Sequence, residues 1–125
     1  MSAYAQARSR AAYQSSAVLT ATQGQLIVML YDGVNRFLVQ AGIAMRDGNV
    51  EVAHQKLRRA EMIISHLRAS LDFEQGGQIA QDLLAIYMFC TRHLNSARVG
   101  RDPEKIEQVA GLLGQLRDAW AQASA

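Results

Sequence analysis

Residues 20–33 read TATQGQLIVMLYDG, and this stretch opens a long amphipathic helix. Leu26 and Leu30 begin a series of apolar residues at steps of three and four, which places their side chains on one face of an α-helix. The series continues to Met45 and stops at the turn signal DGN of residues 47–49. The helix carries more apolar residues than one core-facing stripe needs, which indicates a covering segment or a partner.

Three further segments have the same helical period, and the breaks between them are short. Asn49 is a good N-cap for the second segment, and Asp102 followed by Pro103 marks the start of the fourth. The third follows the Gly76-Gly77 break, and its apolar stripe is expected to run from Ile79 to Ala97. The sequence therefore predicts helices at about 23–46, 50–72, 77–99 and 103–122.

Four helices joined by short loops predict an all-α fold, an antiparallel up-down four-helix bundle. The bundle is expected to occupy residues 23–122. Residues 1–22 lack a helical apolar period and are rich in Ser, Ala and Gln, which is typical of an N-terminal arm. We expect this arm to be mobile or to cap the bundle.

The amino-acid composition limits the classes of function that this protein can have. Half of the residues are hydrophobic, 19% are charged and one is Pro, as in a globular domain. The net charge of +2 comes from basic residues dispersed among acids, so no nucleic-acid surface is expected. Because no uninterrupted apolar run approaches the ~20 residues that span a bilayer, we expect no membrane insertion and a cytoplasmic protein. The single cysteine, Cys90, is expected to be a small buried core residue.

Catalytic and metal-binding patterns are weak. Glu51 and His54 match the Glu-x-x-His spacing of di-iron bundles, but that chemistry needs a second pair and carboxylates from two further helices. Cys90 and His93 could supply two zinc ligands, and the chain has no other Cys to complete such a site. We therefore expect no enzyme activity, metal or cofactor.

Several apolar residues fall outside the expected core stripes when each residue is given about 100° of rotation. They lie on the first and third helices, so a partner that reaches both must wrap around the bundle. The candidate groove comprises Val28, Tyr31, Asn35 and Val39 on the first helix with Leu84 and Met88 on the third.

Two carboxylates have two possible roles. Asp32 and Asp72 each follow an aromatic or apolar residue at a structurally informative place. Either residue can be solvated or cap a helix, or it can form a charge-assisted hydrogen bond that anchors backbone at a docking groove or loop. The sequence leaves both roles open.

Motifs along nearly the whole chain resemble the flagellar secretion chaperone family FliS. Each motif is weak alone, but their order and spacing are specific. One departure is Gln23, where the family often has Pro at the helix start. The matching elements are Ala12-Tyr13, Thr20-Ala21-Thr22, Leu26-Ile27, Leu30-Tyr31-Asp32-Gly33, Ser70-Leu71-Asp72, Gly76-Gly77, Ile86-Tyr87 and Leu116-Arg117-Asp118-Ala119-Trp120.

This resemblance implies a cytosolic export chaperone that binds the disordered C-terminal segment of flagellin. Such a chaperone blocks premature polymerisation and delivers the subunit to the flagellar type III export gate. In the family the N-terminal arm looks like a stand-in for cargo, so Tyr13 and Val18 are the expected cap residues. The alternative is a self-associating helical scaffold that uses the same outward residues in a homodimer.

Overall fold

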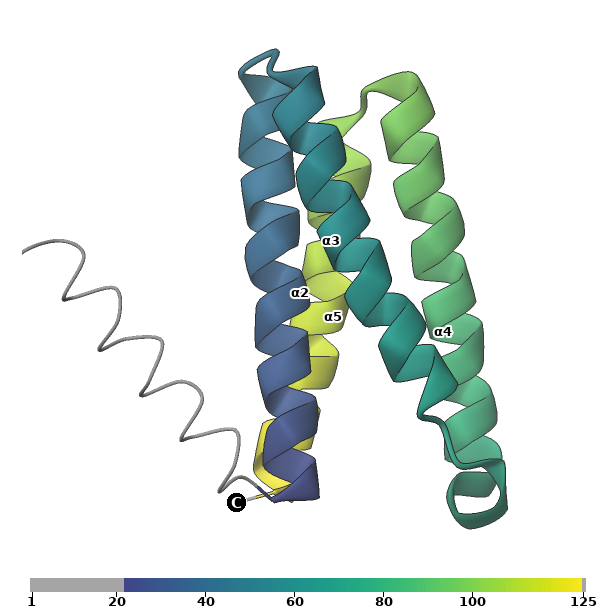
Figure 1. Ribbon diagram of the computed structural model, residues 1–125. Helices are drawn as coiled ribbons and strands as arrows, with labels where there is room; N and C mark the ends of the chain where they lie inside the picture. The colour runs from purple at the N-terminus through teal and green to yellow at the C-terminus, as the bar shows by residue number, and fades with distance from the viewer. Residues whose placement is uncertain (1–21, 125) are drawn as a thin grey trace, which may run out of the picture.

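The computed structural model describes residues 22–124, and these contain four α-helices and no strands. Figure 1 shows that successive helices run in opposite directions, which confirms the predicted all-α, antiparallel up-down bundle. Of the expected N-terminal arm, only Thr22 lies within the described residues. The helices are α2 (Gln23–Arg46), α3 (Val50–Ala69), α4 (Phe73–Gly100) and α5 (Pro103–Ala123).

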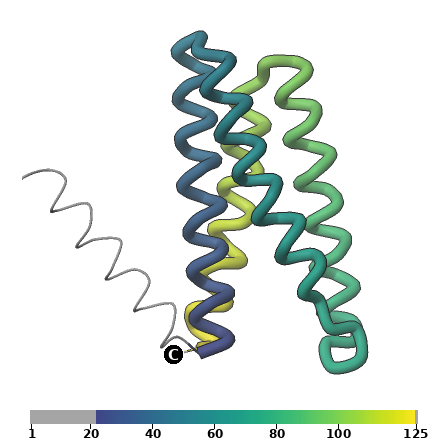
Figure 2. Tube along the Cα trace, viewed as in Figure 1, coloured from purple at the N-terminus to yellow at the C-terminus, as the bar shows by residue number. Residues whose placement is uncertain are grey.

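The helices are arranged in chain order around a common core. α2 packs extensively on both α3 and α5, whereas α4 contacts the same two neighbours more sparsely. α2 and α4 therefore lie on a diagonal of the bundle. The tube in Figure 2 shows α3 close to α2 at the upper loop and close to α4 at the lower loop.

Polar side chains fix the start of each helix. Thr22 and Gln25 form a reciprocal capping box on α2, with the Gln25 amide 3.2 Å from the Thr22 hydroxyl oxygen. Asn49 accepts a hydrogen bond from the backbone of α3, and Asp102 does the same at α5, where Pro103 is the first helical residue. The short connections are thus specified locally.

The junction between α3 and α4 differs from the sequence prediction. α3 ends at Ala69, and the Asp72 carboxylate caps α4 by accepting hydrogen bonds from two backbone amides. α4 then begins at Phe73, and Gly77 interrupts its helical path with a φ of 51°. The expected core position of Ile79 is wrong, because Ile79 lies one turn before the buried Leu83, at the end of the bundle, and 67% of its surface is exposed.

Tyr31 is also placed differently from the prediction. Its expected position on an outer groove is wrong, because its side chain is fully buried in the core. The hydroxyl groups of Tyr31 and Tyr87 lie 2.5 Å apart and share a hydrogen bond, so α2 and α4 are joined across the diagonal. Desolvation raises the pKa of both phenols, which keeps both hydroxyls protonated at neutral pH.

Among the described helices, α2 alone is long and apolar enough to pass a simple test for a membrane span. Core helices of globular proteins pass the same test. In this bundle Val34, Leu38 and Ala41 of α2 are buried against the other helices. Only 28% of its most apolar 18-residue window is buried, so the core accounts for part of the hydropathy of α2 and the rest lies on the surface of the bundle.

The tyrosine pair generates a stability prediction. Tyr87→Phe leaves the Tyr31 hydroxyl buried without its partner, so we expect a loss of about 1–3 kcal/mol in the free energy of unfolding. Tyr31→Phe is expected to cost a similar amount, and the double variant to cost less than the two single variants together. Urea unfolding followed by circular dichroism measures all three. Strictly additive losses would contradict the role given to this hydrogen bond.

Candidate functional site

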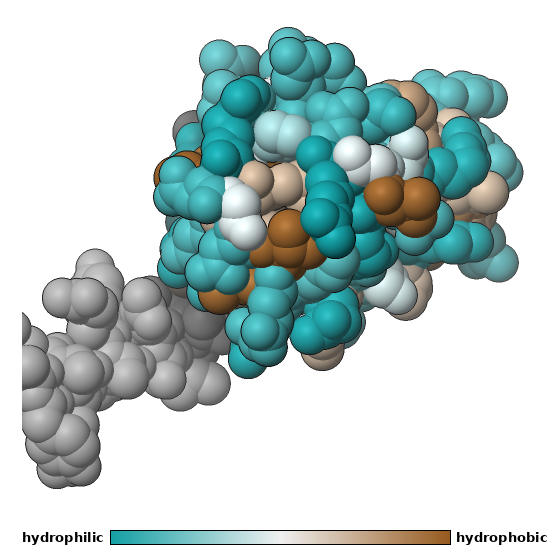
Figure 3. Space-filling model, turned by 90° about the horizontal axis from the view of Figure 1, so that it is seen from above, coloured by the Kyte–Doolittle hydropathy of each residue, from teal (hydrophilic) through white to brown (hydrophobic). Residues whose placement is uncertain are grey.

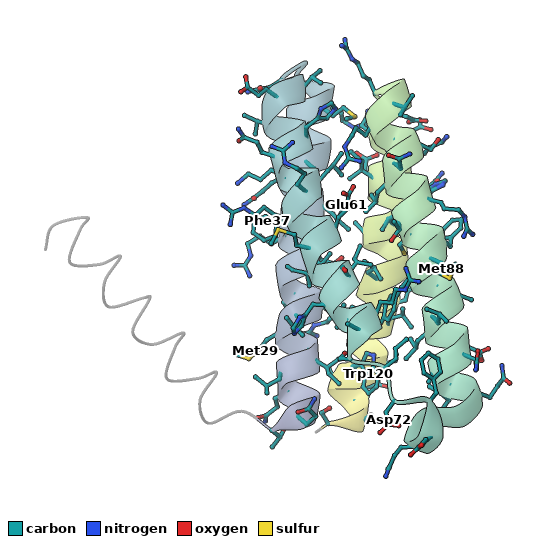
Figure 4. The ribbon with its side chains drawn as sticks, turned by 45° about the vertical axis from the view of Figure 1, so that its right-hand side comes forward. Met29, Phe37, Glu61, Asp72, Met88 and Trp120 are labelled. Carbon is teal, nitrogen blue, oxygen red and sulfur yellow. The ribbon has the colours of Figure 1, made fainter. Side chains whose placement is uncertain are left out.

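The strongest candidate site is an apolar pocket of about 510 Å³ at one end of the bundle, called here the end pocket. It is formed where α2 and α4 begin and where α3 and α5 end. Figure 4 shows two of its residues, Trp120 and Asp72, at this end. The apolar side chains that line it include Ile27, Leu67, Leu71, Ile79, Leu83 and Trp120.

Local sequence explains why this end stays open. α3 stops at Ala69, and the chain passes through Leu71 and the cap residue Asp72 before α4 begins. Gly77 then changes the direction of the first turn of α4, and Ile79, in the regular helix that follows, lines the pocket. Tyr87 lies deeper in the pocket and is held there by its hydrogen bond to Tyr31. The pocket thus has a rigid floor and an exposed apolar rim.

A second apolar hollow, of about 460 Å³, adjoins the end pocket along α2 and α3. Leu26, Met29 and Leu30 line it, and it shares Ile27 with the end pocket. The start of α2 is therefore bordered by a continuous apolar surface. The opposite end of the bundle, seen in Figure 3, is largely hydrophilic with smaller apolar patches.

The predicted groove residues on α2 lie along its border with α5. The Asn35 side-chain amide lies beside Gly114 of α5, and its buried oxygen has no hydrogen-bond partner among the described residues. Val28 is half-buried, while Val39 is 54% exposed. Val28, Asn35 and Val39 therefore form one edge of the bundle.

The predicted residues on α4 lie on the opposite edge. Arg98 pairs with Glu61 of α3, so its face of α4 is turned toward α3. Leu84 precedes Arg98 by about four helical turns and therefore lies on nearly the same face. Leu84 is consequently directed toward α3 and is half-buried, and Met88 beside it is 38% exposed. A ligand that contacts both predicted sets must wrap around the bundle.

Sequence reasoning missed the end pocket, since none of the six predicted groove residues lines it. Ile79 was assigned to a core stripe. The available signals were the Gly76-Gly77 pair, which interrupts the helical phase, and Asp72, which can cap a helix that starts before those glycines. The predicted cap residues Tyr13 and Val18 lie outside the described residues.

Ion pairs connect the helices at two edges. Asp32 of α2 accepts a hydrogen bond of 2.9 Å from Arg117 of α5, so its partner is a side chain rather than backbone. Arg46 of α2 makes a two-point contact with Glu107 of α5, at 2.6 and 2.8 Å. This contact lowers the pKa of the Glu107 carboxyl. Arg98 and Glu61 join α4 to α3.

Two of the candidate metal ligands, Cys90 and His93, are buried or already engaged. Cys90 is fully buried, and burial raises the pKa of its thiol to about 11. His93 stacks on Phe89 and hydrogen-bonds to Gln108 of α5 at 2.6 Å. Within residues 22–124 no three His, Cys, Asp or Glu side chains are grouped so as to hold a metal ion.

Comparison with known proteins identifies relatives along nearly the whole chain. The sequence model of the family described as "Flagellar protein FliS" matches residues 4–125. A flagellar secretion chaperone FliS of Salmonella typhimurium is 42% identical over 110 residues, covering 87% of this chain and 82% of the relative. The FliS of Escherichia coli is 39% identical, covering 86% of this chain and 79% of the relative. That of Bacillus subtilis is 33% identical, covering 90% of this chain and 83% of the relative.

The exposure of Ile79 allows the end pocket to be tested without a cargo. Ile79→Ser should change the free energy of unfolding by less than about 0.5 kcal/mol, because the side chain is mostly exposed. It should reduce binding of an apolar fluorescent dye, measured by energy transfer from Trp120, the only tryptophan. Val99→Ser is the matched control, since Val99 is 79% exposed on the same helix outside the pocket. Equal dye binding by both variants would refute the pocket as the main apolar site.

Proposed function

This chain belongs to the FliS family of flagellar secretion chaperones, and from that premise we propose that it binds the C-terminal segment of flagellin. In this proposal the chaperone works in the cytoplasm, prevents premature polymerisation of flagellin and delivers it to the flagellar type III export gate. The observation that carries the proposal is the apolar end pocket, which is open to an extended or helical apolar segment.

The placement of the apolar surfaces supports a cargo that wraps. The end pocket lies at one end of the bundle, and the exposed apolar residues Val39 and Met88 lie on opposite edges. A folded globular partner reaches one such surface, whereas a disordered segment can follow all three. Ordering the segment costs conformational entropy, which keeps affinity moderate for the area covered and permits release.

We further propose that Val28, Asn35, Val39, Leu84 and Met88 lie on the path of the cargo, with the end pocket as its principal anchor. Tyr31 contributes indirectly, through the hydrogen bond that holds Tyr87 in the pocket. Val28 and Leu84 are half-buried, so each can gain contacts from a cargo without leaving the bundle.

The N-terminal arm is proposed to cover part of this surface in the free chaperone. Thr22 joins the arm to Gln23, which lines both the end pocket and the adjoining hollow. Val18 is four residues from Thr22, and four extended residues span at most about 14 Å. Val18 is therefore within reach of the apolar rim, and the longer link to Tyr13 reaches further along the bundle.

Calorimetric titration with a peptide from the C-terminal end of the flagellin of the same organism tests the function. We expect saturable one-to-one binding with a negative heat-capacity change. Ile79→Asp should weaken binding at least about tenfold, since an apolar contact is replaced by a charge. Val99→Asp should leave the affinity nearly unchanged. A wild-type protein that dimerises on sedimentation but binds no peptide would favour the scaffold alternative.

Deletion of residues 1–16 tests the arm separately. If the arm competes with cargo, the deletion should tighten binding of the flagellin peptide and increase binding of an apolar dye. Both quantities are compared with those of the full-length chain under the same conditions. If neither changed, the proposed role of Tyr13 as a displaceable cap would be wrong, while the peptide titration would still decide the function.

A further inference from the structure

A pocket of about 590 Å³ lies on the outer face of α2 and α3, away from the end pocket, and shares no residue with it. We name it the basic groove. Figure 4 places Phe37 among nitrogen-tipped side chains on this face. The residues that line the groove are Phe37, Gln55, Lys56, Arg58, Arg59 and Met62.

The groove gathers three cations in one pocket. Within residues 22–124 no ion pair includes Lys56, Arg58 or Arg59, and no carboxylate lines the groove. Arg46 and Arg117, in contrast, each pair with an acid on a neighbouring helix. The α2–α3 edge is thus left with uncompensated positive charge.

While the groove is empty, its like charges repel each other and an apolar side chain is exposed to water. Lys56 and Arg59 are three residues apart on α3, where like charges repel each other. Lys56 lies 5.7 Å above the Phe37 ring, a contact that offsets part of this repulsion. Met62 adds an apolar side chain that is 69% exposed. Carboxylates beside the arginines would offset the repulsion between the cations. An apolar group on Met62 would cover its exposed side chain.

We propose that the basic groove docks an acidic, amphipathic helical segment of a partner protein. An apolar residue of that segment packs between Phe37 and Met62, and its flanking carboxylates pair with Arg58 and Arg59. Arginine is suited to this role because its planar guanidinium donates two parallel hydrogen bonds to one carboxylate. Since the groove and the end pocket share no residue, this surface goes beyond the proposed binding of flagellin.

Two other occupants fit the chemistry less well. A second copy of the chain in a symmetric dimer would bring the same basic surface against itself. The N-terminal sequence of the same chain carries Arg8 and Arg10 but no Asp or Glu within residues 1–21, so it has the same sign of charge as the groove. Charge complementarity therefore favours an acidic segment from another protein.

The probe for this proposal is a fluorescent helical peptide built from Glu and Leu, with Leu at three- and four-residue steps. Its control is the same peptide with Lys in place of Glu. The acidic peptide should bind the full-length chain saturably and more weakly as salt increases, and the Lys peptide should not bind. Equal binding of both peptides, or no saturable binding of the acidic one, would overturn the proposal.

Matched variants locate the binding surface. Arg58→Glu with Arg59→Glu should weaken the acidic peptide at least about tenfold, because two attractive contacts become repulsive. Arg68→Glu with Arg92→Glu makes the same change of net charge at exposed positions outside the groove and should change binding less than about twofold. Equal losses in the two double variants would refute the groove as the site.

Two further measurements keep the test specific. Met62→Ser, at a largely exposed position, should fold normally and still weaken the acidic peptide, because the apolar anchor is lost. If a single-stranded oligonucleotide or anionic vesicles bound through Arg58 and Arg59 while the acidic peptide did not, the protein partner would be excluded. Titrating the flagellin peptide into the Arg58→Glu, Arg59→Glu variant tests the end pocket independently.

Discussion

The hydrogen bond between the Tyr31 and Tyr87 hydroxyls is the contact on which the arrangement of this bundle depends. α4 packs more sparsely on its neighbours than α2 does, and this bond joins the two helices across the diagonal. Both phenols are desolvated, and the shared hydrogen bond provides each hydroxyl with a partner. A sliding movement of α4 along its axis would break the bond, and the register between α2 and α4 is thereby fixed.

That fixed register also shapes the end pocket. Tyr87 is both a member of the diagonal pair and part of the pocket lining, so the pocket floor cannot move independently of the core. The rim has the opposite character, because Gly77 breaks the first turn of α4 and Ile79 beside it is largely exposed. In the proposed function, a rigid floor with an exposed apolar rim would hold an apolar segment while leaving it accessible for release.

Local sequence patterns were sufficient to predict the helices and most of the core. They did not predict contacts between residues that are distant in the sequence. Asn49 and Asp102 cap helices as their local sequence predicts. Tyr31 was misplaced because a helical wheel does not reveal its hydrogen-bond partner, which lies 56 residues further along the chain. The hydrogen bond to this partner, Tyr87, makes burial of the phenol favourable. Ile79 was misplaced because its helical phase matches that of the buried Leu83, and the phase does not reveal that the bundle is open at this end.

The pairing of charges also depends on contacts between residues that are distant in the sequence. The dispersed basic residues gave no stripe in the sequence, yet folding pairs Arg46, Arg98 and Arg117 with acids on neighbouring helices. It also gathers three other cations in one pocket between α2 and α3. The two surfaces that result differ in the force that would hold a ligand. Burial of apolar area in the end pocket is little affected by moderate salt, whereas attraction to the basic groove is screened within about 10 Å at 0.1 M salt. The proposed occupants of the two surfaces would therefore respond differently to salt.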